Sequence, residues 1–447
     1  METLSFEKIH SYLTGNLISN NNKNDILEIV IDSREATDKS LFIPIIGENH
    51  DGHKFLESAY ENGCRSFLID KNHKFDKNDI NLIEVKDTKL AYGEIAKNYK
   101  RELNIPCIAI TGSVGKTSTK DMIYGVLSEK YNTSKTIGNL NNDIGVPKTI
   151  LKLNKSHEIS IIEMGMDKKG EISYLTNLVK PNIGVITNIG MSHIEHFENQ
   201  EGIFNAKMEL TEPFNENNIL IVNGDDKFLK QLKNKNKKYK IITCGFEKEN
   251  DIYCEDYEVT SNGATFTCIY NGEKHKYTIP SPAKHNILNA MFAIAIGNIY
   301  NLTENQITKG LQNFKLSSNR LDIFKTKDYT IINDTYNASY DSMMSALEVL
   351  NNFNTRKVAI LGDIFELGSY SEEIHRKIGK NIKCDLLITI GNNSKYIYEE
   401  AKEKIESYHH STKEEFYQNM NILEKEDTIL VKASRGMELE QVVEKLK

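Results

Sequence analysis

The stretch "IPCIAITGSVGKTSTK", residues 105–120, decides the fold of this chain. An apolar run entered through a proline leads into a glycine turn, which Lys116 and Thr117 follow. A strand, a glycine loop and a helix start in this order place backbone N–H groups and the positive helix end around an anion. The usual phosphate-loop pattern needs a glycine five positions before Gly115, where Ile110 stands instead. We therefore expect a nucleotide phosphate loop of unusual form, with a ligand-free glycine turn as the alternative.

In such a loop each side chain has a distinct task. Lys116 would reach the terminal phosphates, and the Thr117 hydroxyl would hold Mg²⁺. The remaining ATP contacts of the loop are predicted at Gly112, Ser113, Val114, Gly115 and Ser118.

Apolar strands alternate with amphipathic helical stretches on both sides of the loop. Alternation of this kind predicts parallel sheets covered by helices. It is interrupted at 251–280, where Asn262-Gly263 and Asn271-Gly272 predict antiparallel hairpins. It resumes after residue 317 with four buried-type strands. We predict an α/β protein of three domains, at 1–104, 105–317 and 318–447.

Size and charge limit the possible functions. The chain has 447 residues, enough for two to four domains, and its net charge of -7 argues against nucleic-acid binding. Its six cysteines form no close pair, which suits a reducing cytosol. No apolar run approaches the roughly 18 residues that cross a bilayer, and the N-terminus lacks a signal-peptide core. We expect a soluble cytoplasmic protein.

Polar side chains follow several of the predicted strands, where open α/β sheets place their ligands. Glu163 ends "ISIIE", and Asn188 and His193 follow "NIGVIT". A carboxylate and an imidazole beside a phosphate loop are candidate metal ligands, although a solvent-exposed strand end is the equal alternative. A zinc pair of His193 with His196 lacks a third ligand at a suitable spacing. Lys207, in the helical stretch 202–210, reads on its own as an exposed lysine.

Two further polar groups carry open alternatives. Asn286 and Asn289, one turn apart, could contact a base edge or cap their helix. Asp334 and Asn337 end the strand in "YTIINDTYN", where they could hold a ligand or build a turn.

Taken together, these motifs resemble the Mur ligases of bacterial cell-wall synthesis. The loop Thr111–Thr117 has that family's T-G-x-x-G-K-T form, and the resemblance extends over "EMG", "TNIGMSH", "AKMEL", "HNILNA", "SSNRLD" and "NDTYNAS". Among the family, "DSR", "LFIPIIGENHDGHKF", "NLNNDIGVPKTIL", "LGDIFELG" and "LVKASRGMELE" are most similar to the members that add D-alanyl-D-alanine. One departure is Ser339-Tyr340, where the family has Asn-Pro, which puts the local turn geometry in question.

The resemblance implies a reaction and a set of ligands. ATP would phosphorylate the terminal carboxylate of UDP-N-acetylmuramoyl-tripeptide, and the amine of D-alanyl-D-alanine would attack the acyl phosphate. Lys116, Glu163, His193 and Lys207 would form the catalytic centre. Two Mg²⁺ ions would be held by Thr117 and Glu163, and by His193 with Lys207 as a CO₂-derived carbamate.

The resemblance also assigns the outer contacts. Asn286, Asn289, Arg320 and Asp334 would bind the nucleotide, Asp334 at its ribose. The N-terminal domain would hold the UDP end of the substrate through Ser33 and Arg34, and the protein would act as a monomer.

The sequence leaves some alternatives open. It fits either lysine or diaminopimelate as the third residue of the tripeptide. A sister ligase that adds that third residue is the nearest rival, although its usual "NPR"-type motif is missing, and the "DSR" domain argues against a folate polyglutamate ligase. A P-loop switch would be expected to carry a full phosphate-loop pattern and, for guanine, an N-K-x-D segment after a central strand.

Overall fold

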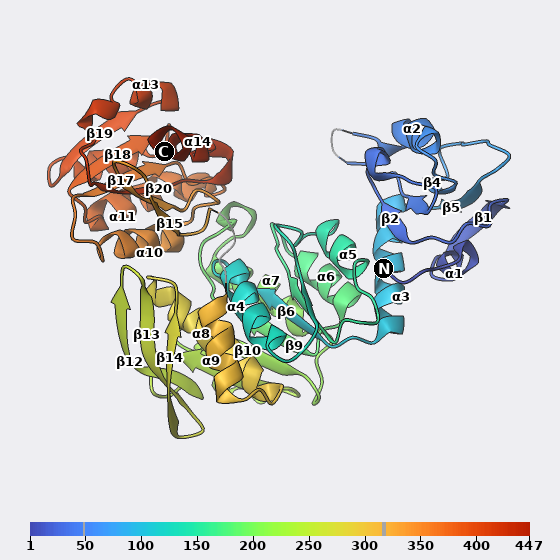
Figure 1. The fold of residues 1–447 in the computed structure, drawn as a ribbon, viewed down its shortest axis with the longest axis horizontal. Helices are drawn as coiled ribbons and strands as arrows, with labels where there is room; N and C mark the ends of the chain where they lie inside the picture. Colours follow the sequence, from blue (N-terminus) through green and yellow to red (C-terminus); the bar gives the residue numbers. More distant parts are fainter. Residues whose placement is uncertain (48–49, 315–318) are drawn as a thin grey trace. The chain divides into compact units, whose positions relative to one another are not determined.

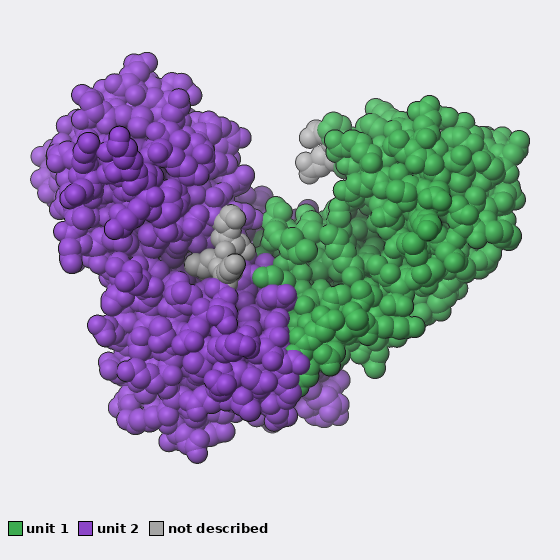
Figure 2. Space-filling view, viewed as in Figure 1, with its two compact units in different colours: residues 1–109, 131–166, 171–182 green, residues 110–130, 167–170, 183–447 purple. Residues whose placement is uncertain are grey.

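The computed structural model describes residues 1–47, 50–314 and 319–447. The described chain divides into two compact units (Figure 2). The first unit comprises residues 1–109, 131–166 and 171–182, and the second comprises residues 110–130, 167–170 and 183–447. The boundary that the sequence predicts at residues 317 and 318 lies outside the described residues.

The first sheet has five strands in the order β1-β5-β4-β3-β2 (Figure 1). Its strands are β1 (Gly15–Asn20), β2 (Glu28–Val30), β3 (Ser40–Phe42), β4 (Ser66–Asp70) and β5 (Asn81–Val85). All neighbours pair in parallel except β1 with β5. Helices α1 (Phe6–His10), α2 (Leu56–Glu61) and α3 (Thr88–Leu103) accompany the sheet. Its core is aromatic and aliphatic, with Phe42 and Phe67 packed edge to face.

The largest sheet has nine strands in the order β14-β13-β12-β11-β10-β9-β6-β8-β7. Their bounds are β6 (Cys107–Thr111), β7 (Thr133–Lys135), β8 (Ile159–Glu163), β9 (Ile183–Ile186), β10 (Ile219–Asn223), β11 (Lys240–Gly245), β12 (Ile252–Thr260), β13 (Gly263–Tyr270) and β14 (Glu273–Ile279). Strands β9, β10 and β11 are parallel, whereas β12, β13 and β14 are antiparallel. The predicted hairpins are thus confirmed, and Asn271 and Gly272 both have the positive φ that such a turn requires.

Six helices belong to the middle part of the chain. They are α4 (Lys116–Ser128), α5 (Gly145–Ile150), α6 (Glu171–Val179), α7 (Gln200–Met208), α8 (Lys284–Ile299) and α9 (Glu304–Asn313). Helix α8 is buried along most of its length, since most of its residues are apolar, and it packs on α4 (Figure 1). Helix α9 also packs on α4 and starts with a capping box of Thr303 and Gln306.

The last sheet has six strands in the order β15-β16-β20-β17-β18-β19. Its strands are β15 (Asp322–Lys325), β16 (Thr330–Asn333), β17 (Lys357–Gly362), β18 (Leu386–Ile390), β19 (Glu406–His410) and β20 (Thr428–Lys432). Its helices are α10 (Tyr340–Leu350), α11 (Ser371–Asn381), α12 (Lys395–Ala401), α13 (Lys413–Tyr417) and α14 (Glu440–Leu446). The four predicted strands are the inner ones, and they are buried apart from the first residues of β16 and β17. The prediction missed β15 and β19, which form the edges and contain exposed and half-buried residues.

The observed architecture confirms the predicted fold class. Three sheets, mostly parallel and each accompanied by helices, make an α/β protein. Among the described residues, no helix combines the length and the apolar character that a membrane crossing would demand.

Candidate active site

The glycines of the phosphate loop are required by its backbone. Strand β6 ends at Thr111, and α4 begins at Lys116, so the loop spans Gly112 to Gly115. Gly112 has φ 150° and Gly115 has φ 84°, which are values that L side chains rarely adopt. A Cβ on Gly112 would also collide with the Thr187 hydroxyl. The loop therefore has the shape of an anion cradle, with the α4 N-terminus at its end.

The segment after β9 holds this loop in place. The Asn188 side-chain oxygen accepts from the backbone N–H of Ser113 (3.1 Å) and of Val114 (3.0 Å). The Thr187 hydroxyl donates to the Val114 carbonyl (2.6 Å), and the Gly190 N–H donates to the Ser113 hydroxyl (2.8 Å). Asn188 thus braces the loop.

Lys116 and Thr117 are the first two residues of α4. The Lys116 ammonium donates to the carbonyls of Gly112 (2.7 Å) and Ser113 (3.3 Å), so it lies folded across the loop. Thr117 is buried in the first turn of α4, and Ser118 beside it is half-buried. A cationic amine and a hydroxyl at a helix start fit a nucleotide phosphate and its Mg²⁺.

Glu163 is the last residue of β8 and is buried. Its carboxylate accepts from the Asn141 side-chain amide (2.9 Å), which fixes its direction. A buried, oriented carboxylate fits a hard cation such as Mg²⁺ because oxygen is that ion's preferred ligand. The alternative of a solvent-exposed strand end does not describe this residue.

His193 has the left-handed φ of 60° and stands directly before a short 3₁₀ turn. Its Nδ1 lies 2.6 Å from the Glu366 carboxylate and 3.2 Å from that of Asp167. The close His193 ring lowers the pKa of the Glu366 carboxyl below its ordinary value, although Nδ1 itself forms no hydrogen bond among the described residues. With Nδ1 facing the two carboxylates, Nε2 is the nitrogen that could face a ligand.

Lys207 is buried in α7, where the sequence alone favoured exposure. Burial and the neighbouring Lys116 charge lower the pKa of its amine well below the ordinary value. Within the described ranges, none of the hydrogen bonds or ion pairs involves the Lys207 amine. A lysine in this environment favours the neutral, nucleophilic form.

Asn286 and Asn289 form a buried chain of amides instead of capping α8. The Asn286 amide donates to the Ser281 hydroxyl (2.7 Å), and the Asn289 amide donates to the Asn286 oxygen (2.8 Å). The Asn289 oxygen accepts from the Thr119 hydroxyl of α4 (3.0 Å). The chain therefore ties α8 to the helix that carries the phosphate loop.

Arg320 and Asp334 lie together where the last sheet begins. The Arg320 guanidinium stacks over the Tyr336 ring at 3.9 Å. Asp334 accepts from the Leu321 N–H (3.2 Å) through one carboxylate oxygen and from the Lys432 ammonium (2.6 Å) through the other. Lys432 lies within "LVKASRGMELE", but its pairing with Asp334 could not be predicted, because the lysine ends an apolar strand and its partner lies far away along the chain.

Ser33 and Arg34 lie on a 3₁₀ turn of the first unit. Ser33 is buried, and Arg34 is exposed and forms a two-pronged ion pair with Asp32 (2.6 Å at the shortest). An exposed guanidinium next to a buried serine is compatible with a diphosphate contact.

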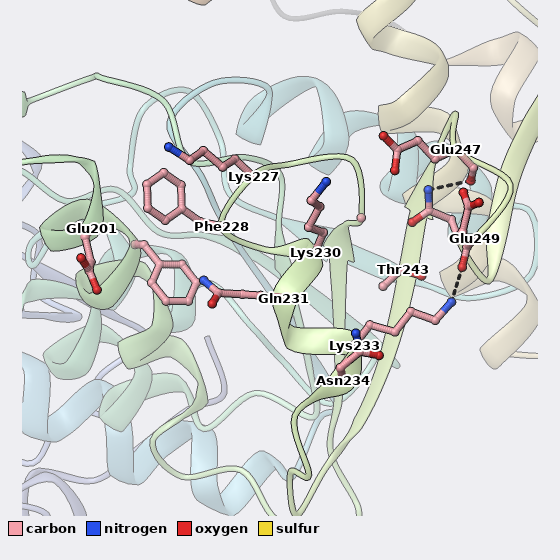
Figure 3. A pocket seen from close by; sticks show the side chains of 13 residues that line it. Glu201, Lys227, Phe228, Lys230, Gln231, Lys233, Asn234, Thr243, Glu247 and Glu249 are labelled. Carbon is pink, nitrogen blue, oxygen red and sulfur yellow. Dashed lines mark hydrogen bonds between the residues drawn. The ribbon is translucent and has the colours of Figure 1, made fainter.

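A cavity of about 900 Å³ beside α7, β10 and β11 is lined by other residues than these (Figure 3). Its lining includes Phe204, Phe228 and the lysines Lys227, Lys230 and Lys233. Both lysine and glutamate side chains line it, so its charge favours no class of ligand, and we assign it no part in the reaction.

The fold and the site define a class of protein, namely a P-loop α/β enzyme that uses a nucleoside triphosphate. Three family models match the chain: "Mur ligase family, catalytic domain" at residues 25–101, "Mur ligase middle domain" at 110–297 and "Mur ligase, glutamate ligase domain" at 319–435. The chain belongs to the Mur ligase family, and the resemblance seen in the sequence is confirmed.

Individual proteins of the family match this chain over nearly its whole length. The chain is 38% identical over 428 residues to the UDP-N-acetylmuramoyl-tripeptide--D-alanyl-D-alanine ligase of Bacillus subtilis, covering 94% of this chain and 92% of that protein. The crystal structure of MurF from Acinetobacter baumannii matches with a TM-score of 0.93 at 29% identity, over 100% and 99% of the two chains. MurF from Thermotoga maritima, solved in complex with ADP, matches with a TM-score of 0.84 at 25% identity, over 93% and 96%.

Proposed function

We propose that this chain is an ATP-dependent ligase that joins D-alanyl-D-alanine to UDP-N-acetylmuramoyl-tripeptide. The observation that carries the proposal is the braced phosphate loop with a buried, unpaired Lys207 beside the charge of Lys116. Relatives with that ligase name, matched over nearly the whole chain, support the choice of substrates.

The reaction would proceed in two steps. The tripeptide carboxylate attacks the γ-phosphorus of ATP, and ADP leaves, giving an acyl phosphate. The dipeptide amine then attacks the acyl carbon, and a tetrahedral intermediate collapses to the amide with loss of phosphate. Because the first step brings anions together, positive groups must be in place beforehand. Lys116 and the α4 N-terminus would supply this positive charge.

We further propose how the residues would hold two Mg²⁺ ions. Thr117 and Glu163 would bind one ion, and His193 and carbamylated Lys207 would bind the other. Bound Mg²⁺ would neutralise phosphate charge during transfer. A neutral Lys207 amine can take up CO₂, whereas a protonated one cannot, and burial favours the neutral amine.

The remaining assignments extend this proposal. Residues 1–104 would hold the UDP end through Ser33 and Arg34, residues 105–317 would hold ATP, and residues 318–447 would present the dipeptide. The nucleotide would be contacted by Asn286, Asn289, Arg320 and Asp334, and the amide chain of the two asparagines also ties α8 to α4. The protein would act as a monomer in a reducing compartment such as the cytoplasm, in keeping with six free, buried cysteines.

The test is phosphate release from ATP and Mg²⁺ in the presence of the UDP-linked tripeptide, with and without D-alanyl-D-alanine. We expect release that depends on both substrates, together with a product of the summed mass. Activity with single amino acids on a dipeptide-linked precursor would indicate the ligase that adds the third residue. Release with neither substrate would indicate a P-loop switch and contradict the proposal.

A further inference from the structure

Glu366 lies in a loop whose backbone is fixed by buried partners. The loop follows β17, and the Ile364 N–H donates to His375 Nε2 (3.0 Å). The next N–H, of Phe365, donates to the Ser434 hydroxyl (2.9 Å). Glu366 itself has a φ of 62°, a left-handed value that a non-glycine residue adopts only when its surroundings enforce it. The chain therefore presents the Glu366 side chain in a set direction.

That direction is toward the His193 imidazole. The Glu366 carboxylate lies 2.6 Å from His193 Nδ1, nearer than Asp167 at 3.2 Å. Among the described residues Nδ1 forms no hydrogen bond, so the contact is an electrostatic one, and the negative charge of the carboxylate favours the ring form that carries its proton on Nδ1. In a neutral imidazole, a proton on Nδ1 leaves the Nε2 lone pair free for a metal ion or a substrate group.

The pair connects residues of the second unit that follow strands of two different sheets. His193 follows β9 of the nine-stranded sheet, and Glu366 follows β17 of the six-stranded sheet. Two neighbouring contacts accompany it. A Cβ built on Gly368 would lie 3.0 Å from the Glu195 Cβ, and one on Gly190 would lie 2.5 Å from the Asp341 carboxylate. The two glycines thus allow the six-stranded sheet to come close to the segment after β9, and the ion pair between His193 and Glu366 requires this close contact.

We propose that Glu366 is a positioning residue that sets the Nδ1–H form and the orientation of His193 when the six-stranded sheet docks on the segment after β9. When the six-stranded sheet docks, Glu366 reaches His193, and the Nε2 atom of His193 is then free to bind the metal ion. This role rests on the proposed function in that His193 serves the phosphoryl-transfer site. A metal-binding histidine commonly donates its other N–H to a carboxylate, and loss of such a partner typically lowers metal affinity 10- to 100-fold.

The experiment compares Glu366→Ala with Glu195→Ala. Glu195 forms the neighbouring histidine–carboxylate pair, with His196 at 3.6 Å, and serves as the matched control. Two-dimensional ¹⁵N–¹H spectra of the full chain, labelled at histidine, are recorded without nucleotide at about pH 8.5, where an ordinary histidine is neutral. Loss of a resonance in His193→Gln assigns His193.

We expect His193 to be in the Nδ1–H tautomer in the wild-type chain and in Glu195→Ala, and to shift toward the Nε2–H tautomer in Glu366→Ala. The Mg²⁺ concentration for half-maximal turnover should rise about 10- to 100-fold in Glu366→Ala alone. A His193 spectrum that is the same in Glu366→Ala and wild type would overturn the inference. Because the spectra need no substrate, they remain decisive even if dipeptide-dependent phosphate release is not found, which would refute the proposed function instead.

Discussion

Two lysines of the second unit are equally buried and differently partnered. Lys432, at the end of β20, is 1% exposed and donates to Asp334 (2.6 Å) and to the Asn337 carbonyl (2.8 Å). Lys207, in α7, is 3% exposed, and its pKa is lowered by burial and by the like charge of Lys116. A buried ammonium needs a counter-ion, and where none is present the lysine becomes neutral instead.

The difference indicates that Lys432 supports the fold and makes Lys207 a candidate for a role in the reaction. Lys432 compensates a buried carboxylate, so its removal would leave Asp334 without its cation. Lys207 compensates nothing within the described chain, and its burial opposes stability. A residue retained under that penalty is a candidate for function. The predictions below test this contrast, from the largest expected effect to the smallest.

The largest effect is expected from Lys207→Met. If Lys207 is the metal ligand proposed above, the change should reduce dipeptide-dependent phosphate release by more than about 10³-fold, since such a ligand would supply several kcal/mol of transition-state stabilisation. Urea unfolding should show stability that is unchanged or increased, because an apolar side chain replaces an unpaired amine. Lys227→Met, at an exposed lysine of the same unit, is the control and should leave both quantities unchanged. Turnover within about tenfold of wild type in Lys207→Met would contradict a role of Lys207 in the reaction.

Lys432→Met should have the opposite profile. Removing one member of a buried ion pair leaves an uncompensated charge and costs about 3–5 kcal/mol of unfolding free energy. The double change Lys432→Met with Asp334→Asn should recover much of that loss, because the amide carries no charge. Equilibrium unfolding of the three variants measures the effect. A loss below about 1 kcal/mol in Lys432→Met would mean that the pair does not stabilise the fold.

A pH series distinguishes the two lysines without activity measurements. The folded pKa of Lys207 is depressed by burial, whereas the unfolded value is about 10.4. Between these values the unfolded chain binds more protons, so stability should rise with pH and level off above about 10.4. It should fall as pH drops toward the depressed folded pKa. Lys207→Met should flatten this rise when unfolding is followed in CO₂-free, nucleotide-free buffer. An unchanged slope would show that Lys207 is charged in the folded state.

The fold could be predicted from sequence wherever burial is local. Apolar runs gave the inner strands such as β6, β8 and β17, and Asn271-Gly272 gave a hairpin turn. Edge strands such as β19 carry mixed polar residues and make no such signal, because only one side of them is paired and covered. The inner strands of a sheet can therefore be predicted from a single sequence more readily than its edge strands.

The candidate site was less visible because its key features depend on distant partners. The phosphate loop is local, so its residues could be read directly from the sequence. The burial of Lys207, by contrast, comes from packing that no neighbouring residue reveals, and only the family resemblance indicated its role. Lys432 meets Asp334 from 98 residues away, and the sequence does not show that pairing or the one between Glu366 and His193.

The smallest predicted effect concerns a third kind of environment, in which a partly exposed histidine has two counter-ions. In the first unit, His73 Nδ1 lies 2.8 Å from Asp70 and its Nε2 lies 3.1 Å from Asp51. Its ring stacks on His53 at 3.8 Å. His53 accepts the Asp70 N–H at Nε2 (3.2 Å) and faces Asp51 with Nδ1 (2.8 Å), an arrangement that suits a neutral ring. Two carboxylates therefore face both nitrogens of His73.

The hydrogen bond to Asp70 is the main cause that raises the pKa of His73 above its ordinary value. Its contribution to stability should be complete below the unfolded value of about 6.5 and should be lost as pH rises through the raised folded pKa. Hydrogen exchange of residues 51–73, corrected for intrinsic rates, should show protection that falls over this range in the wild-type chain. His73→Gln should remove the pH dependence, whereas His157→Gln, at a ring that accepts from the Asn154 backbone, should keep it. The effect should be small because His73 is 32% exposed and solvent screens its ion pairs. Protection that does not respond to pH in the wild-type chain would show that the paired carboxylates do not stabilise this segment through a charged His73.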